Sequence, residues 1–190
     1  VLNVNYFVKI SQSGGLPVFD TEFLASEEIK AFIDQLHQKK ILFGIRISCR
    51  QKEIIDFIQQ HHLPYLNLII LYYDYPEELT QGLLPQNKDI QIFIEAIDIE
   101  INKFIEQMNP HALILKGNEA PGKVSEYTSF LLMQWYLENT GYPVFIHGGV
   151  GFHTAAGMFS AGASGIVLDD QLYLTEEAPL SDSFKEMIKE

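Results

Sequence analysis

The sequence has a single cysteine and far fewer basic than acidic residues. Cys49 is the only cysteine among 190 residues. An internal disulfide and a cysteine-ligated metal site are therefore excluded, and the composition fits a reducing compartment. Lysine and arginine together number 13 against 25 aspartate and glutamate residues, which gives a net charge of −12 and a pI near 4.8. Because this charge repels phosphate backbones and anionic lipids, nucleic acids and membrane surfaces are excluded as partners.

Long apolar runs are also missing. The longest, such as residues 66–73, are far too short to span a bilayer, and the N-terminus has no charged segment followed by an apolar one. We therefore predict a cytoplasmic protein. The chain is 47% hydrophobic, which suffices for one core, so we expect a single domain over residues 1–190. Val1 in place of an initiator methionine indicates a piece of a longer chain or a trimmed product.

Apolar runs of strand length alternate with segments of helical period along the whole chain. The pattern predicts strands over residues 16–20, 41–48, 65–73, 90–96, 112–116, 144–146 and 165–168, with helices over 26–39, 51–61, 98–108, 126–139 and 153–161. Residues 74–88 contain two prolines and a glycine and predict a degraded helix or a loop. Strands that are apolar throughout are covered on both faces, which favours a parallel α/β architecture.

The number of strands distinguishes between the parallel folds. A closed (β/α)₈ barrel has eight strands, one more than the sequence predicts. Val4, Phe7 and Val8 have helical spacing and precede a glycine pair that resembles a helix C-cap, so we expect the chain to begin at the first helix. The predicted fold is a (β/α)₈ TIM barrel that lacks its first strand, which would lie upstream of Val1. A doubly wound sheet is the alternative, although its glycine fingerprint should follow the first strand rather than the next to last.

The stretch "HGGVG" follows the predicted strand 144–146. In (β/α)₈ barrels the loops after strands seven and eight commonly form a phosphate site. Gly148, Gly149 and Gly151 would let backbone N–H groups approach phosphate oxygens at a helix N-terminus. The alternative interpretation is a plain strand-to-helix turn. His147 and His153 flank these glycines without the spacing of a metalloenzyme, so we predict no metal site.

A second polar loop follows the strand 112–116 at the same end of the predicted barrel. Lys116 closes this strand, and its ammonium could lie near flavin N1 and O2, where negative charge develops on reduction. The alternative is a solvated strand end. Gly117, Glu119, Gly122 and Lys123 belong to the loop. Glu119 could orient either lysine or be a surface charge.

Together, "KGNEAPGKVSEYTSFLLMQ" and "PVFIHGGVGFHTAAGMFSAGASGIVLD" resemble the nitronate monooxygenase (2-nitropropane dioxygenase) family of FMN-binding barrels. The chain is more similar to the flavin-barrel modules of polyketide and polyunsaturated fatty acid synthases than to the stand-alone enzymes. The resemblance extends weakly to residues 11–24. It implies FMN at the carboxyl ends of the strands, with its phosphate held by Gly148, Gly149 and the region of Asp169 and Asp170. The "GNEAPG" loop would lie beside the isoalloxazine ring.

Two positions depart from the family pattern. Lys123 stands where the monooxygenases have the histidine that removes the α-proton of a nitroalkane. A lysine is protonated at neutral pH, and can then donate a proton or stabilise an anion but cannot accept a proton. Asp169 and Asp170 stand where the monooxygenases carry Gly-Thr. Carboxylates beside a phosphate are unfavourable unless they point away or meet a cation.

The resemblance predicts an FMN-dependent oxidoreductase, with Lys123 and Glu119 as catalytic residues. Lys116, Gly117, Gly122, Gly148, Gly149, Gly151, Asp169 and Asp170 are the predicted cofactor-binding residues. Three alternatives stay open: an enoyl reductase-type module of a multidomain polyketide or fatty acid synthase, a non-catalytic barrel module, and an unrelated barrel that acts on a sugar or nucleotide phosphate. The expected partners are a small-molecule or acyl-thioester substrate and other domains of a larger synthase.

Overall fold

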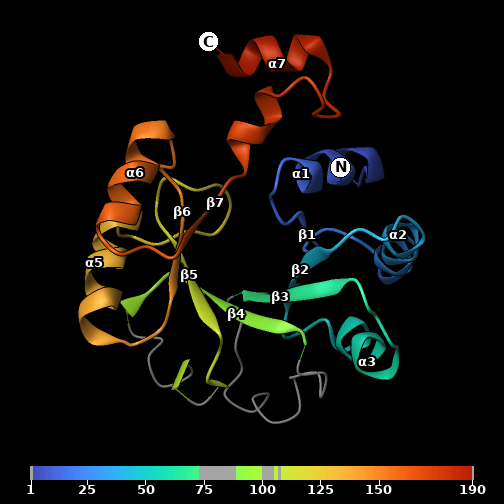
Figure 1. Ribbon diagram of the computed structural model, residues 1–190, viewed down its shortest axis with the longest axis horizontal. Helices are drawn as coiled ribbons and strands as arrows, with labels where there is room; N and C mark the ends of the chain where they lie inside the picture. The colour runs from blue at the N-terminus through green and yellow to red at the C-terminus, as the bar shows by residue number, and fades with distance from the viewer. Residues whose placement is uncertain (1, 73–88, 100–104, 107, 190) are drawn as a thin grey trace.

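The computed structural model describes residues 2–72, 89–99, 105–106 and 108–189. These residues form one parallel sheet of seven strands, each paired with the next strand along the chain. The strands are β1 (Val18–Asp20), β2 (Phe43–Ser48), β3 (Leu66–Tyr72), β4 (Gln91–Ala96), β5 (Ala112–Lys116), β6 (Val144–His147) and β7 (Gly165–Val167). The sheet curls, and helices cover its outer side (Figure 1).

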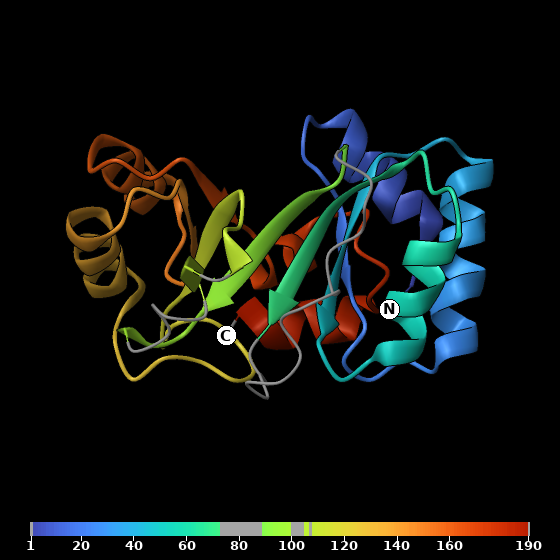
Figure 2. The same cartoon turned by 90° about the horizontal axis from the view of Figure 1, so that it is seen from below.

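The described helices are α1 (Val4–Gln12), α2 (Ser26–Gln38), α3 (Lys52–Gln60), α5 (Ser129–Asn139), α6 (Phe152–Ser160), the 3₁₀-helix η3 (Asp170–Leu174) and α7 (Asp182–Lys189). Among the described residues, helices alternate with strands from α1 to β3 and again from β5 to η3. Figure 2 shows α2 and α3, in blue and cyan, beside the first strands of the curled sheet and α5 and α6, in gold and orange, beside the last strands. This arrangement places the loops that follow the strands together at one end of the curled sheet.

The sheet order confirms the predicted barrel architecture. Strands pair in parallel and in sequence order, for example Ile45 of β2 with Ile69 of β3 and Lys116 of β5 with His147 of β6. In a doubly wound sheet the order of the strands reverses near the centre, as in 3-2-1-4-5-6. The doubly wound alternative is therefore wrong.

The predicted amphipathic faces are the faces that the structure buries. In α2, the apolar positions Ile29, Phe32, Ile33 and Leu36 are all buried against the sheet. The start of α5 differs, because the helix begins at Ser129 rather than at the predicted residue 126. The Thr128 side chain accepts a hydrogen bond from the Leu131 N–H, at 3.3 Å, and so defines the N-cap of α5.

Helix α1, near the N-terminus, contacts η3, which follows the last strand of the sheet. Helix α1 confirms the predicted helix at the N-terminus, and the Tyr6 hydroxyl donates a hydrogen bond of 2.8 Å to the Leu172 carbonyl in η3. Among the described residues, β1 and β7 each have one strand neighbour, so they are the two edges of the sheet. Such edges carry backbone groups that a further strand can pair with.

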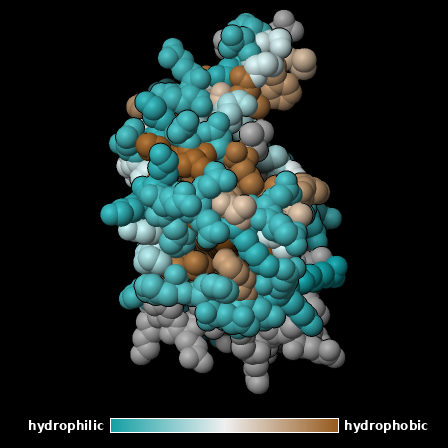
Figure 3. All heavy atoms as spheres, turned by 90° about the vertical axis from the view of Figure 1, so that its right-hand side faces the viewer, coloured by the Kyte–Doolittle hydropathy of each residue, from teal (hydrophilic) through white to brown (hydrophobic). Residues whose placement is uncertain are grey.

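Other parts of the chain were not predicted or lie outside the described residues. The sequence pattern did not predict η3 and α7. Residues 74–88 and most of the predicted helix 98–108 fall outside the described ranges. No helix among the described residues has the length and apolar character needed to cross a membrane. The surface in Figure 3 is largely hydrophilic, with separate apolar patches.

Candidate active site

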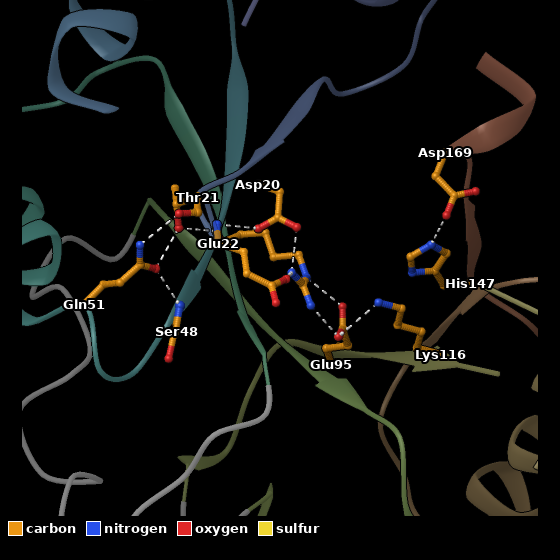
Figure 4. Close-up of polar contacts among 10 residues, drawn as sticks. Asp20, Thr21, Glu22, Ser48, Gln51, Glu95, Lys116, His147 and Asp169 are labelled. Carbon is orange, nitrogen blue, oxygen red and sulfur yellow. Dashed lines mark hydrogen bonds and ion pairs between the residues drawn. The ribbon is translucent and has the colours of Figure 1, made fainter. Parts of the chain in front are cut away.

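Charged side chains from several strands meet at the carboxyl ends of the sheet. Figure 4 shows Glu95, Lys116, His147 and Asp169 together with the acidic and polar residues of the β1 region. Arg46 on β2 and Glu95 on β4 reach one another across β3, which lies between them in the sheet. In (β/α)₈ barrels, alternate strands supply the same interior layer, and active sites lie at the carboxyl ends of the strands. We call Arg46, Glu95, Lys116, His147 and Asp169 the polar mouth.

Arg46 and Glu95 form a buried, two-pronged ion pair. Arg46 Nε lies 2.9 Å from Glu95 Oε2, and Arg46 Nη2 lies 2.8 Å from Glu95 Oε1. Arg46 Nη1 also donates to Asp20, at 2.7 Å, and the guanidinium carbon lies 3.9 Å from the centroid of the Tyr72 ring. Burial alone would lower the pKa of Arg46, but the carboxylates of Glu95, Asp20 and Glu22 together outweigh burial and raise it. The pair is therefore a fixed, charged element of the mouth.

Lys116 places a second cation beside the same carboxylate. Its Nζ lies 3.8 Å from Glu95 Oε1, and its side chain is 5% exposed. The loop that follows β5 passes close to this amine, because a Cβ on Gly122 would lie 3.6 Å from Lys116 Nζ. Gly122 has φ +80°, a conformation that favours glycine. Lys116 is thus held in the mouth and shares Glu95 with Arg46.

Glu119 lies at the start of α5. Its Oε2 accepts a hydrogen bond of 3.0 Å from the Ser129 N–H, and the Ser129 hydroxyl lies 3.5 Å from its Oε1. The Ser129 hydroxyl also donates to the Gly148 carbonyl, at 3.1 Å. A carboxylate at a helix N-terminus is favourable because it meets the positive end of the helix dipole. The structure therefore gives Glu119 a helix-capping contact and joins the β5–α5 loop to the glycine turn.

Two of the predicted cofactor-binding glycines are required by close packing. A Cβ on Gly117 would lie 2.1 Å from the Ser129 nitrogen, and a Cβ on Gly148 would lie 2.9 Å from the Ala120 nitrogen. Gly148 also has φ +105°. The start of α5 packs against Gly117, and the β5–α5 loop packs against Gly148, so close packing explains both glycines without a ligand.

The last two glycines of the turn lead into α6. Gly149 has φ +63°, in the left-handed region. The Gly151 N–H donates to the Thr154 hydroxyl, at 2.6 Å, and the same hydroxyl lies 2.8 Å from the Gly149 carbonyl. The turn and the first residues of α6 are therefore fastened to each other.

Asp169 and His147 form the other charged pair of the polar mouth. His147 Nε2 lies 2.6 Å from Asp169 Oδ2. Burial alone would raise the pKa of Asp169, but the hydrogen bonds from His147 and from Asp170 outweigh burial and lower it to about 2. Hydrogen bonding to Asp169 and partial burial raise the pKa of Asp170. The strand β7 therefore leads into a carboxylate that stays ionised at neutral pH.

Part of this site could be predicted from the sequence. Lys116 and Asp169 were predicted, and the structure places both in the polar mouth, whereas His147 was considered only as a metal ligand. Arg46 and Glu95 were not predicted, although each is a lone charge inside an apolar strand, in "FGIRIS" and "QIFIEA". A lone charge in an apolar strand is a signal for a buried ion pair, because buried charges in proteins are paired. The described residues hold no group of three or more metal-ligating side chains.

Comparisons with known proteins agree with the architecture. No family model matches the sequence, and no curated protein matches it. FabK from Thermotoga maritima superposes with a TM-score of 0.82 at 18% identity, covering 97% of this chain and 59% of FabK. Nitroalkane oxidase from Streptomyces ansochromogenes superposes with a TM-score of 0.74 at 16% identity, covering 98% of this chain and 66% of the oxidase. Thiamine phosphate pyrophosphorylase from Pyrococcus furiosus superposes with a TM-score of 0.66 at 14% identity, covering 98% of this chain and 88% of the pyrophosphorylase.

At these identities the likeness concerns the fold. The chain spans less than two thirds of the length of FabK. The seven-stranded curled parallel sheet, its sequential strand order and its helical cover are shared with TIM-barrel structures. The chain is an α/β protein with a partial (β/α)₈ barrel, and its polar mouth lies where such barrels place their active sites.

Proposed function

We propose that this chain is the barrel part of a flavin-dependent oxidoreductase of the nitronate monooxygenase-like type. The observation that carries the proposal is the buried Lys116 ammonium at the carboxyl end of β5, beside the loop that the sequence resemblance assigns to the isoalloxazine ring. Two of the similar structures support the reaction class, since they are named nitroalkane oxidase and mandelate oxidase. Substrate and cofactor follow from the resemblance and the chemistry of the mouth.

The residues present fit the ring portion of a flavin. A bound flavin would supply hydride transfer to or from a substrate. Lys116 would place its positive charge against the part of the ring that becomes negative on reduction. Glu95 holds Lys116 in position, because the carboxylate is itself fixed by two bonds from Arg46. The resemblance implies FMN and would place its phosphate at the turn after β6 and the start of η3.

Lys123 would act on the substrate. It is exposed and lies in the β5–α5 loop, next in the chain to Gly122, where a Cβ would lie 3.6 Å from Lys116 Nζ. A protonated lysine can supply a proton to the enolate that forms when an enoyl thioester receives a hydride. Nitroalkane oxidation instead begins with removal of a proton from carbon, which needs a base. We therefore propose reduction of an activated enoyl thioester over oxidation of neutral nitroalkanes.

Substitution of Lys123 tests this choice. We expect the flavin-loaded wild type to turn over neutral nitroalkanes poorly, and Lys123→His to raise the rate, because an imidazole can accept the α-proton. Lys123→Met should leave the nitroalkane rate low and reduce enoyl thioester reduction, by roughly 10²-fold if proton donation is rate-limiting. Steady-state assays on both substrate classes measure these rates. Rapid nitroalkane oxidation by the wild type would refute the assignment of Lys123.

Two features favour a second candidate, a barrel that serves as a non-catalytic module of a synthase. Asp169 and Asp170 lie where the resemblance implies a phosphate, and β1 and β7 are open sheet edges among the described residues. We propose that a further strand, from polypeptide outside this sequence, pairs between those edges, and that other synthase domains are partners. Failure of the longest native polypeptide with this sequence to bind any flavin would favour this candidate.

A further inference from the structure

The start of η3 has no backbone donor left for a ligand phosphate. The Asp169 N–H donates to Gln171 Oε1, at 3.2 Å, and the Asp170 N–H donates to Asp169 Oδ1, at 2.7 Å. The Gln171 N–H donates to Asp170 Oδ1, at 3.0 Å. Phosphates bind at such positions because backbone N–H groups point at them. Here all three N–H groups already meet side-chain oxygens of this chain.

The charge at this position is also already negative. The Asp169 carboxylate is ionised at neutral pH, since its pKa lies near 2, and His147 is its partner at 2.6 Å. A phosphate beside Asp169 would therefore meet a like charge whose adjacent imidazole is already engaged. Two like charges in contact repel each other strongly where solvent is partly excluded.

The neighbouring turn is held from two sides. The Gln171 side-chain amide donates to the Val150 carbonyl, at 2.9 Å, which ties η3 to the turn after β6. On the other side, a Cβ on Gly148 would lie 2.9 Å from the Ala120 nitrogen. Moving the turn to admit a phosphate would break the Gln171 contact and disturb the packing of the β5–α5 loop.

We infer that the start of η3, beside the turn after β6, excludes a phosphate group, because Asp169 itself occupies the anion position. The inference rests on the proposed flavin function in one respect. It predicts that the polar mouth binds a flavin through its ring and that a 5′-phosphate adds no affinity. The polar mouth would then bind riboflavin, the phosphate-free flavin, as tightly as FMN.

Riboflavin and FMN differ only by the phosphate, so the ratio of their dissociation constants isolates this group. We would titrate both flavins by fluorescence quenching into the longest native polypeptide that contains this sequence, as wild type and as Asp169→Asn. In the wild type we expect FMN to bind no more tightly than riboflavin. In Asp169→Asn the ratio should shift toward FMN by about tenfold, because a like charge is removed. Asp182→Asn, the same charge change at the exposed start of α7, should leave the ratio unchanged.

A second titration, with inorganic phosphate, separates this inference from the flavin proposal. The NMR signals of the His147 ring should not move in the wild type at millimolar phosphate and should move in Asp169→Asn. If neither flavin binds but this phosphate pattern holds, the flavin proposal fails and the exclusion stands. FMN binding tenfold or more tighter than riboflavin in the wild type, phosphate shifts in the wild type, or no phosphate shift in Asp169→Asn would each overturn the inference.

Discussion

Substitution of Glu95 by leucine should cause the largest loss of stability of any single change in the polar mouth. The substitution leaves two buried cations, Arg46 and Lys116, without the carboxylate that they share. Removal of one partner from a buried ion pair typically costs about 3–5 kcal/mol in the free energy of unfolding. Urea denaturation followed by circular dichroism measures this loss.

An exposed ion pair provides the control. Glu53 on α3 pairs with Lys30 on α2, and its side chain is 59% exposed. Glu53→Gln should therefore leave the unfolding midpoint almost unchanged, because water screens exposed pairs. Replacement of Arg46 by methionine in the Glu95→Leu background should recover part of the loss, since one unpaired cation is removed. If Glu95→Leu lowered the free energy of unfolding no more than Glu53→Gln does, the polar mouth would not be a buried ionic network.

Substitution of Gly117 by alanine should cause the second largest loss. The new Cβ would lie 2.1 Å from the Ser129 nitrogen and 2.6 Å from its Cα, both of which are backbone atoms of α5. Since backbone cannot rotate away like a side chain, the loop must shift and weaken the contact between Glu119 and Ser129. Overpacking of this kind costs about 1–3 kcal/mol. Thermal and urea denaturation give the magnitude.

Gly157, in the middle of α6, is the control for Gly117. A Cβ at this position meets nothing within 4 Å. Gly157→Ala should therefore stabilise the protein by about 0.5–1 kcal/mol, because alanine loses less backbone entropy on folding. Equal stability of Gly117→Ala and the wild type would mean that Gly117 does not pack against the start of α5.

The order of elements could be predicted from the sequence because each element carries its own local signal. The period of Ile29, Phe32 and Ile33 predicted the buried face of α2, and continuous apolar runs predicted the parallel strands. Partners across the barrel carry no such signal. Arg46 and Glu95 are 49 residues apart and meet only because the sheet curls over β3.

Glycine-rich motifs were the least specific part of the sequence analysis. Gly117 and Gly148 matched a flavin-barrel pattern, and the structure accounts for Gly117 by contact with the start of α5 and for Gly148 by contact with the β5–α5 loop. The role of Glu119 depends on where α5 begins, and helix starts are hard to locate from sequence alone. By contrast, Asp169 was noted as a departure from the family pattern, and the structure shows its physical consequence at the start of η3.

The central claim is that Lys116 lies beside the ring of a bound flavin, and the reduction potential of that flavin tests it most directly. The measurement is photoreduction of protein-bound riboflavin alongside a dye of known potential, for the wild type, Lys116→Met and the exposed control Lys39→Met. We predict a saturable change in the visible flavin spectrum and a midpoint potential about 30–60 mV lower in Lys116→Met than in the other two proteins, because a buried cation stabilises the reduced, negatively charged ring. No spectral change on titration, or the same potential in all three proteins, would contradict the account.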